Sequence, residues 1–131
     1  AVVQATEKVL KALWAEGYAP GQVVVLSWHG AAGHAPVLQC DTLAGHRVRR
    51  WLGRFDAATN PVFSEGPLRA ETVHRFKGQS APVIVLTGLD FQELTAPLRR
   101  RLFVAMTRAQ HKLVCVGNQA AMDALGRALA G

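Results

Sequence analysis

Side chains suited to a buried face recur at intervals of three and four residues along residues 2–16, and this spacing predicts an amphipathic helix. The residues on this face are Val2, Val3, Thr6, Val9, Leu10, Leu13 and Trp14. Gly17 follows as the expected left-handed residue at the helix end, and Pro20 and Gly21 mark a turn. Because the chain enters a helix almost at once and does not begin with Met, we expect it to be an excerpt of a longer protein.

Strands are predicted where β-branched and aliphatic residues form short runs bounded by turn residues. The runs QVVVLS at 22–27 and VIVLT at 83–87 are almost wholly apolar, which is typical of strands buried on both faces of a parallel sheet. Further strands are expected at residues 37–40, 68–73 and 111–116.

Helical segments are predicted between these strands. Residues 95–110 have one apolar stripe with arginines off it, residues 42–54 are expected to form a basic helix, and residues 119–130 an Ala-rich one. Residues 28–36, 56–67 and 74–82 are expected to be loops. Because strands and helices alternate, the pattern predicts an α/β fold with a mainly parallel sheet and right-handed crossovers.

Length and composition narrow the class of protein. A chain of 131 residues suits one domain, and with half its residues apolar and 18% charged it can form a packed core rather than a disordered segment. The net charge of +6 favours polyanionic partners. We expect no membrane association, because the apolar runs are too short to span a bilayer. Two cysteines make no disulfide framework, so we expect a cytoplasmic protein.

Two stretches carry chemistry beyond the fold. They are ETVHRFKGQ at 71–79 and RRLFVAMTRA at 100–109. Together they resemble motifs V (T-x-H-x-x-K-G) and VI (R-L-x-Y/F-V-A-x-T-R-A) of superfamily 1 DNA helicases of the UvrD/Rep type. The resemblance covers about residues 20–120, with VVVLS at 23–27 in the place of the motif IV strand. It implies that residues 1–131 form the C-terminal, second RecA-like domain, a three-layer α/β domain of the P-loop NTPase type.

Arg108 is the candidate catalytic residue. A guanidinium is always ionised and forks onto phosphate oxygens in a way that Lys cannot reproduce. The resemblance implies that Arg108 reaches the γ-phosphate of ATP from across a domain interface, where such an arginine raises the rate by on the order of 10³ to 10⁵. The alternative is an arginine that merely caps or solvates its helix. Thr107 beside it is expected to orient the helix rather than to bind a ligand.

Thr72, His74 and Lys77 follow the carboxyl end of a predicted strand, where open α/β sheets place their ligands. A hydroxyl, an imidazole and an ammonium group can bind successive phosphates of a single strand without reading its bases. The resemblance implies that these three residues contact single-stranded DNA. It also implies that ATP contacts Gly78, Gln79, Ser80 and Arg108. The alternative is a surface turn in which His74 packs and Gly78 provides the bend.

The chain departs from the family at two positions. Ser80 stands where the family usually has Glu, which removes the expected contact with the ribose, and Trp28 stands where an Arg usually follows the motif IV strand. Trp28 either stacks on a base or seals the core, and we favour the core. These departures support an alternative function, a degenerate helicase-like module that binds nucleic acid or protein without ATPase activity.

Two weaker patterns remain. The set His29, His34, Cys40 and His46 matches no standard zinc spacing, so no metal site is expected. The basic run Arg47, Arg49, Arg50 and Arg54 with Trp51 has a solvated helix face as its favoured interpretation and nucleic-acid binding as the alternative.

The chain has no G-x-x-x-x-G-K-[ST] phosphate loop and no Asp-Glu pair after an apolar strand. ATP and Mg²⁺ are therefore expected to be bound mainly by a first, N-terminal RecA-like domain of the same protein. We therefore expect this chain to be the second motor domain of an ATP-dependent helicase or translocase. Its expected partners are that N-terminal domain and single-stranded DNA. The isolated chain is expected not to hydrolyse ATP.

Overall fold

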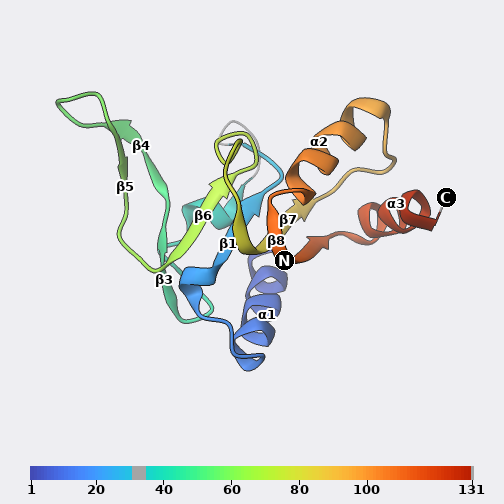
Figure 1. The fold of residues 1–131 in the computed structure, drawn as a ribbon, viewed down its shortest axis with the longest axis horizontal. Helices are drawn as coiled ribbons and strands as arrows, with labels where there is room; N and C mark the ends of the chain where they lie inside the picture. The colour runs from blue at the N-terminus through green and yellow to red at the C-terminus, as the bar shows by residue number, and fades with distance from the viewer. Residues whose placement is uncertain (31–34, 131) are drawn as a thin grey trace.

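The computed structural model describes residues 1–30 and 35–130. Its centre is a six-stranded sheet with the order β2-β3-β6-β1-β7-β8, shown in Figure 1. The strands are β1 (Val23–Ser27), β2 (Thr42–Leu43), β3 (His46–Arg49), β6 (Leu68–Thr72), β7 (Ala81–Leu89) and β8 (Ala109–Gly117). Neighbouring strands are parallel except at the β2-β3 edge, where the pair is antiparallel. The expected α/β fold with a mainly parallel sheet is confirmed.

Helices cover both faces of this sheet. They are α1 (Val2–Ala15), α2 (Ala96–Met106) and α3 (Gln119–Ala130), with short 3₁₀ turns η1 (Pro20–Gln22) and η2 (Pro36–Gln39). Alternate residues of β1 face opposite layers: Val23 and Val25 pack in one core with α1, whereas Val24 and Leu26 pack in the other with α2 and α3. The result is three layers, helix on sheet on helix. None of the helices in the described ranges is long and apolar enough to cross a membrane.

The predicted first helix is confirmed. Leu10 and Leu13 of α1 are buried against the sheet, and the Thr6 hydroxyl shares a buried hydrogen bond of 2.6 Å with the Thr87 hydroxyl of β7. Gly17 follows the helix with a φ of +98°, a left-handed conformation that glycine adopts without strain.

Helix α2 is shorter than the predicted 95–110. Its first turn is capped by the Thr95 hydroxyl, which accepts a hydrogen bond of 3.4 Å from the Leu98 amide. It ends at Met106 because Ala109 already belongs to β8, where it pairs with Ala81. The Thr107 hydroxyl donates a hydrogen bond of 2.8 Å to the Val104 carbonyl, in keeping with its expected structural role.

The predicted basic helix at 42–54 is wrong. This segment forms β2, β3 and β4 (Trp51–Phe55). Strand β4 pairs with β5 (Pro61–Phe63) in a separate two-stranded sheet, and β5 lies in the stretch 56–67 that was expected to be loop. Ala44 and Gly45, with φ of +49° and +85°, make a tight turn between β2 and β3, and Gly53 at +78° also leaves the helical region. The predicted strand at 37–40 is likewise wrong, since Pro36 begins η2 there.

Candidate nucleic-acid and nucleotide site

The segment 73–80 runs from the carboxyl ends of the parallel strands, here called the carboxyl edge of the sheet, to their amino ends, the amino edge. It joins the end of β6 to the start of β7, and both strands run parallel to β1, which lies between them. Thr72 therefore lies at the carboxyl edge of the sheet and Ser80 at the amino edge. The motif that resembles motif V thus reaches both ends of the parallel strands.

This crossing segment is a turn ordered by its own backbone. Thr72 accepts two hydrogen bonds of 3.1 Å, one at its hydroxyl from the Arg75 amide and one at its carbonyl from the Phe76 amide. The Phe76 ring is 1% exposed and anchors the turn in the core. Gly78 has a φ of +82°, so its conformational freedom is needed for the turn itself. Of the three residues predicted to contact DNA, Thr72 is buried and its hydroxyl is used within the turn, whereas His74 and Lys77 are exposed.

His74 and Lys77 face the helix that carries the second motif. Together with Arg100 and Arg101 of α2 they line an open cavity of ≈ 320 Å³ between the turn and the helix. The structure therefore brings two predicted DNA-contacting residues to two arginines that we did not single out as site residues. The signal for them was present in the RRL sequence that opens the second motif, but helical periodicity alone indicated only that they lie off the apolar stripe.

Arg101 is held against Trp28 at the carboxyl end of β1. Its guanidinium lies 4.2 Å from the centroid of the indole ring and donates a hydrogen bond to the Trp28 carbonyl. Trp28 is 2% exposed and packs edge-on against Phe91, with ring centroids 5.7 Å apart, which confirms its place in the core. Burial lowers the pKa of Arg101, but an arginine still carries its charge at neutral pH. The contact therefore keeps a positive charge at the edge of the cavity.

Ser80 and Arg108 meet at the opposite edge of the sheet. The Arg108 carbonyl accepts a hydrogen bond of 3.1 Å from the Ala81 amide, and the Ser80 hydroxyl accepts one of 2.9 Å from the Gln110 side chain. The Arg108 Nε is buried and has no hydrogen-bond partner within residues 1–30 and 35–130. An unpaired buried donor of this kind costs free energy until it finds an acceptor.

The side chain of Gln79 is occupied within the turn. Its Oε1 accepts a hydrogen bond of 2.8 Å from the Arg69 guanidinium, and its Nε2 donates one of 3.4 Å to the Arg75 carbonyl. The arrangement favours a role for Gln79 in shaping the turn.

The three described members of the candidate zinc set have separate partners. His29 bonds to Asp90 at 2.8 Å, the Cys40 thiol donates a hydrogen bond of 3.4 Å to the Pro36 carbonyl, and His46 packs against Trp14. Burial, and then the Glu7 carboxylate, raise the pKa of the Cys40 thiol, which disfavours the thiolate that a metal would need. His34 lies outside the described residues.

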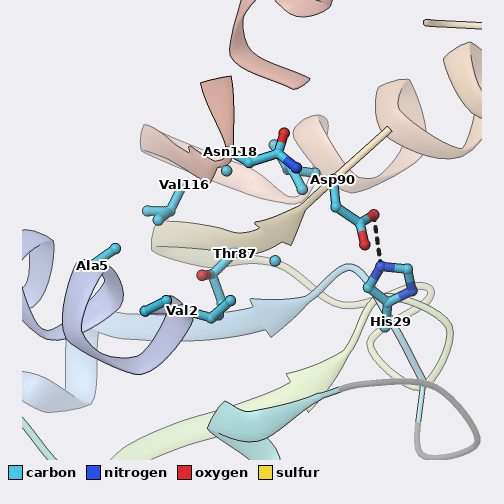
Figure 2. A pocket seen from close by; sticks show the side chains of 11 residues that line it. Val2, Ala5, His29, Thr87, Asp90, Val116 and Asn118 are labelled. Atoms are coloured by element: carbon cyan, nitrogen blue, oxygen red, sulfur yellow. Dashed lines mark hydrogen bonds and ion pairs between the residues drawn. The ribbon is translucent and has the colours of Figure 1, made fainter. Parts of the chain in front are cut away.

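A second cavity, shown in Figure 2, lies at the carboxyl ends of β1, β7 and β8. The His29–Asp90 pair stands at one side of it, and Val2 and Ala5 of α1 at the other. Asn118 uses its side-chain oxygen to accept a hydrogen bond of 2.9 Å from the Ala121 amide at the start of α3. This cavity was not predicted from the sequence.

Residues in the second half of the chain are similar to a known protein family. Residues 67–116 match the family model of the UvrD-like helicase C-terminal domain. This span includes β6, the turn, β7, α2 and nearly all of β8, and so every residue predicted to contact DNA or ATP. No curated protein matches the chain significantly. The α/β layers are consistent with a RecA-like fold, and residues 67–116, which contain both motifs, are similar to the UvrD-like helicase C-terminal domain family.

Proposed function

We propose that residues 1–131 form the second motor domain of an ATP-dependent superfamily 1 DNA helicase or translocase. In this proposal one edge of the domain binds single-stranded DNA and the other contributes Arg108 to ATP hydrolysis. The observation that carries the proposal is the path of residues 73–80, one short segment that joins the two edges. The family match supports the same assignment.

The DNA side is supported by charge and exposure. His74 and Lys77 are exposed, and Arg100 and Arg101 lie across the cavity from them. Cationic groups spaced along an open surface bind the phosphates of a single strand and discriminate little between bases. Single-stranded DNA is therefore the partner that this cavity suits best.

The nucleotide side is supported by the unpaired nitrogen of Arg108. A half-buried guanidinium with a free donor suits an anionic acceptor outside the described chain, such as the γ-phosphate of ATP bound to another domain. ATP with Mg²⁺ would supply the phosphoryl group that is transferred to water. In our proposal the N-terminal RecA-like domain holds both, while Arg108 neutralises charge on the transferring group. Gly78 and Ser80 lie on the same segment and approach the nucleotide through the backbone.

Coupling between the two edges follows from the shortness of the crossing. Phe76 anchors the middle of the segment in the core, while Thr72 holds its start and Ser80 its end. When a strand of DNA displaces His74 or Lys77, the short backbone on either side cannot absorb the displacement. The displacement reaches Ser80 and, through the pairing of Ala81 with the Arg108 carbonyl, the catalytic arginine.

One observation favours a second candidate function, a module that binds nucleic acid or protein without turnover. Ser80 offers no carboxylate to a ribose, and its hydroxyl is bonded to Gln110. In that case the DNA side would remain and the nucleotide side would be inactive.

Replacing both His74 and Lys77 with Ala should weaken the binding of single-stranded DNA by about tenfold or more, because each substitution removes a hydrogen bond to a charged phosphate. The effect should be equal for oligonucleotides of different sequence. The slope of log K against log salt should flatten by about 0.7 for each phosphate that the variant no longer neutralises. Fluorescence anisotropy over a salt series measures all three quantities.

The matched control removes Lys8 and Lys11, two exposed lysines on α1, which packs against the other face of the sheet. This control should leave the salt slope close to that of the unaltered chain. An equal weakening in the control, or a weakening restricted to particular base sequences, would argue against a phosphate track at His74 and Lys77.

A further inference from the structure

The β4–β5 hairpin, residues 51–63, forms an arm that stands away from the rest of the domain in Figure 1. Its strands pair only with each other within the described chain, and five residues of β strand extend about 17 Å. The tip is ordered by Asp56, whose carboxylate accepts hydrogen bonds of 2.9 Å from the Ala58 amide and 3.0 Å from the Asn60 amide. The arm therefore has a defined shape.

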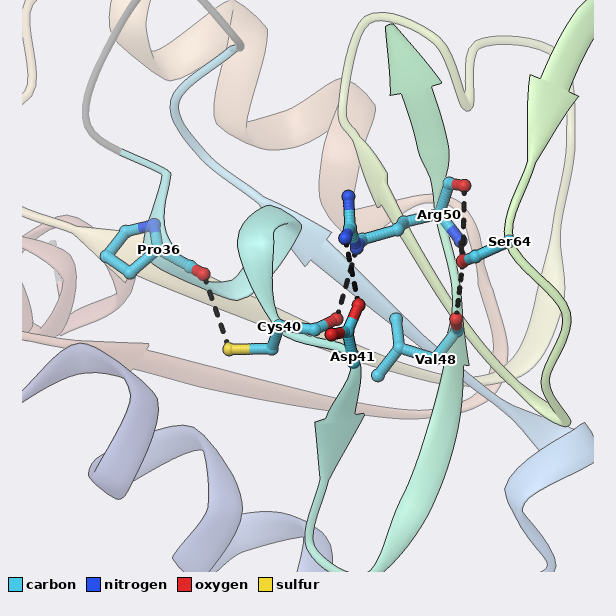
Figure 3. Close-up of polar contacts among 6 residues, drawn as sticks. All are labelled: Pro36, Cys40, Asp41, Val48, Arg50 and Ser64. Atoms are coloured by element: carbon cyan, nitrogen blue, oxygen red, sulfur yellow. Dashed lines mark hydrogen bonds and ion pairs between the residues drawn. The ribbon is translucent and has the colours of Figure 1, made fainter.

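The base of the arm is tied to the domain by the polar contacts in Figure 3. The Ser64 hydroxyl donates a hydrogen bond of 2.7 Å to the Val48 carbonyl and accepts one of 3.0 Å from the Arg50 amide. The Arg50 side chain donates to the Cys40 carbonyl at 3.2 Å and pairs with Asp41 at 3.0 Å. These contacts fix the direction in which the arm leaves the sheet.

The arm presents aromatic rings that no described residue covers completely. Phe55, next to the tip, is 61% exposed, and its ring and the Trp51 indole pack in an edge-to-face arrangement with centroids 5.6 Å apart. The Arg75 guanidinium lies 3.5 Å from the centroid of the Trp51 ring. Because Arg75 belongs to the 73–80 turn, the arm contacts the same turn that carries His74 and Lys77.

The charge around the arm is positive. Residues 47–77 contain seven of the fifteen Lys and Arg of the chain but only three of its nine Asp and Glu. A groove lined by Arg50, Trp51, Thr72 and Arg75 joins the base of the arm to the end of β6. The lining also includes the buried Glu71, and it ends at the Trp51 ring, against which the exposed Phe55 packs. Two arginines beside a pair of aromatic rings match the chemistry of a single nucleic-acid strand.

We propose that the arm is a second contact surface for single-stranded nucleic acid, on which Phe55 stacks against a base and Arg54 binds a phosphate. The inference rests on the proposed function, since the same strand would continue from His74 and Lys77 along the groove. Base stacking on an aromatic ring tolerates any sequence, as a translocating domain requires. A nucleic-acid strand also supplies a phosphate at every nucleotide for the arginines in and beside the arm, whereas a protein partner would need a matching row of acidic side chains.

Binding to a normal and to an abasic oligonucleotide of the same length tests the inference. Phe55→Ala should weaken binding of the normal strand by about 5- to 100-fold and leave binding of the abasic strand unchanged, because only the normal strand has bases to stack. Arg54→Ala should weaken both strands alike and flatten the salt slope by about 0.7. Both side chains are exposed, so the thermal unfolding temperature should stay the same.

Two residues of α3 serve as matched controls. Leu129→Ala removes an apolar side chain that is 71% exposed, and Arg127→Ala removes an exposed charge, and neither should change DNA binding. If Phe55→Ala and Arg54→Ala bind as the controls do while the His74 and Lys77 double variant is impaired, the arm is not a nucleic-acid surface and the proposed track stands. If the arm variants are impaired and the double variant is not, the arm binds the strand and the track assigned under the proposed function is wrong.

Discussion

Replacing Arg108 with Ala, in a protein that joins this domain to a P-loop domain, should lower kcat for DNA-stimulated ATP hydrolysis by about 10³-fold or more. Affinity for ATP should hardly change, because an arginine that acts on charge developing in the transition state contributes little to ground-state binding. Steady-state hydrolysis and equilibrium nucleotide binding, measured on the same preparation, separate these two effects.

Three further results bear on this prediction. Arg108→Lys should recover little activity, since a point charge cannot reproduce the guanidinium fork. The alanine variant loses no hydrogen bond of the Arg108 Nε within the described residues and is relieved of an unpaired buried donor, so it should unfold at a temperature no lower than that of the unaltered protein. Arg127→Ala, which removes a distant exposed arginine, should keep full activity. An unchanged kcat in Arg108→Ala would show that this arginine only solvates the end of its helix.

Truncating Trp28 to Ala should lower the free energy of unfolding by about 3–5 kcal/mol. The indole is buried between Phe91 and the Arg101 guanidinium, and its removal leaves a cavity that its neighbours fill only in part. Urea unfolding followed by circular dichroism measures this decrease. Phe103→Ala, at a side chain that is 68% exposed, provides the comparison and should cost well under 1 kcal/mol.

The Trp28 variants also test the link between the core and the site. Trp28→Phe should lose less stability than Trp28→Ala because it keeps an aromatic face for Arg101. A Trp28→Ala protein as stable as Phe103→Ala would contradict the position of this side chain in the core.

The central strands could be predicted because burial on both faces leaves a strong sequence signal. Residues of VVVLS alternate between the core under α1 and the core under α2 and α3, so every position is apolar or small. The first helix was equally clear, since its buried residues follow one stripe. Elements that are packed against the rest of the protein have apolar residues at each buried position, and this pattern can be recognised in the sequence.

The error at 42–54 has the opposite cause. In β3 the exposed Arg47 and Arg49 flank the buried Val48, but β4 has no buried residue, so the two-residue alternation ends after a few positions and is too short to indicate strands. The density of arginines there resembled a charged helix face. Gly45 and Gly53, which take positive φ, were the available signals against a helix. The arm itself could not be predicted, because its strands pair with each other and its direction depends on the contacts of Arg50 and Ser64.

The candidate site shows the same division. His74 and Lys77 were predicted from a motif, and the structure places them together on one exposed turn. The contact of Arg101 with Trp28 joins residues 73 positions apart, so no local sequence pattern could predict it. The pairing of the segments before β7 and β8, which brings Ser80 beside Arg108, likewise depends on the order of strands in the sheet.

We propose that this domain completes a motor whose phosphate loop lies in another domain. The rate of ATP hydrolysis tests this proposal, with and without single-stranded DNA, when it is measured for the 131-residue chain alone and for a protein that joins the chain to a P-loop domain. The chain alone should show no hydrolysis above background in either condition, because it has no phosphate-binding loop, and the joined protein should show turnover that DNA stimulates. Hydrolysis by the chain alone, or a joined protein whose turnover does not respond to DNA, would contradict the account.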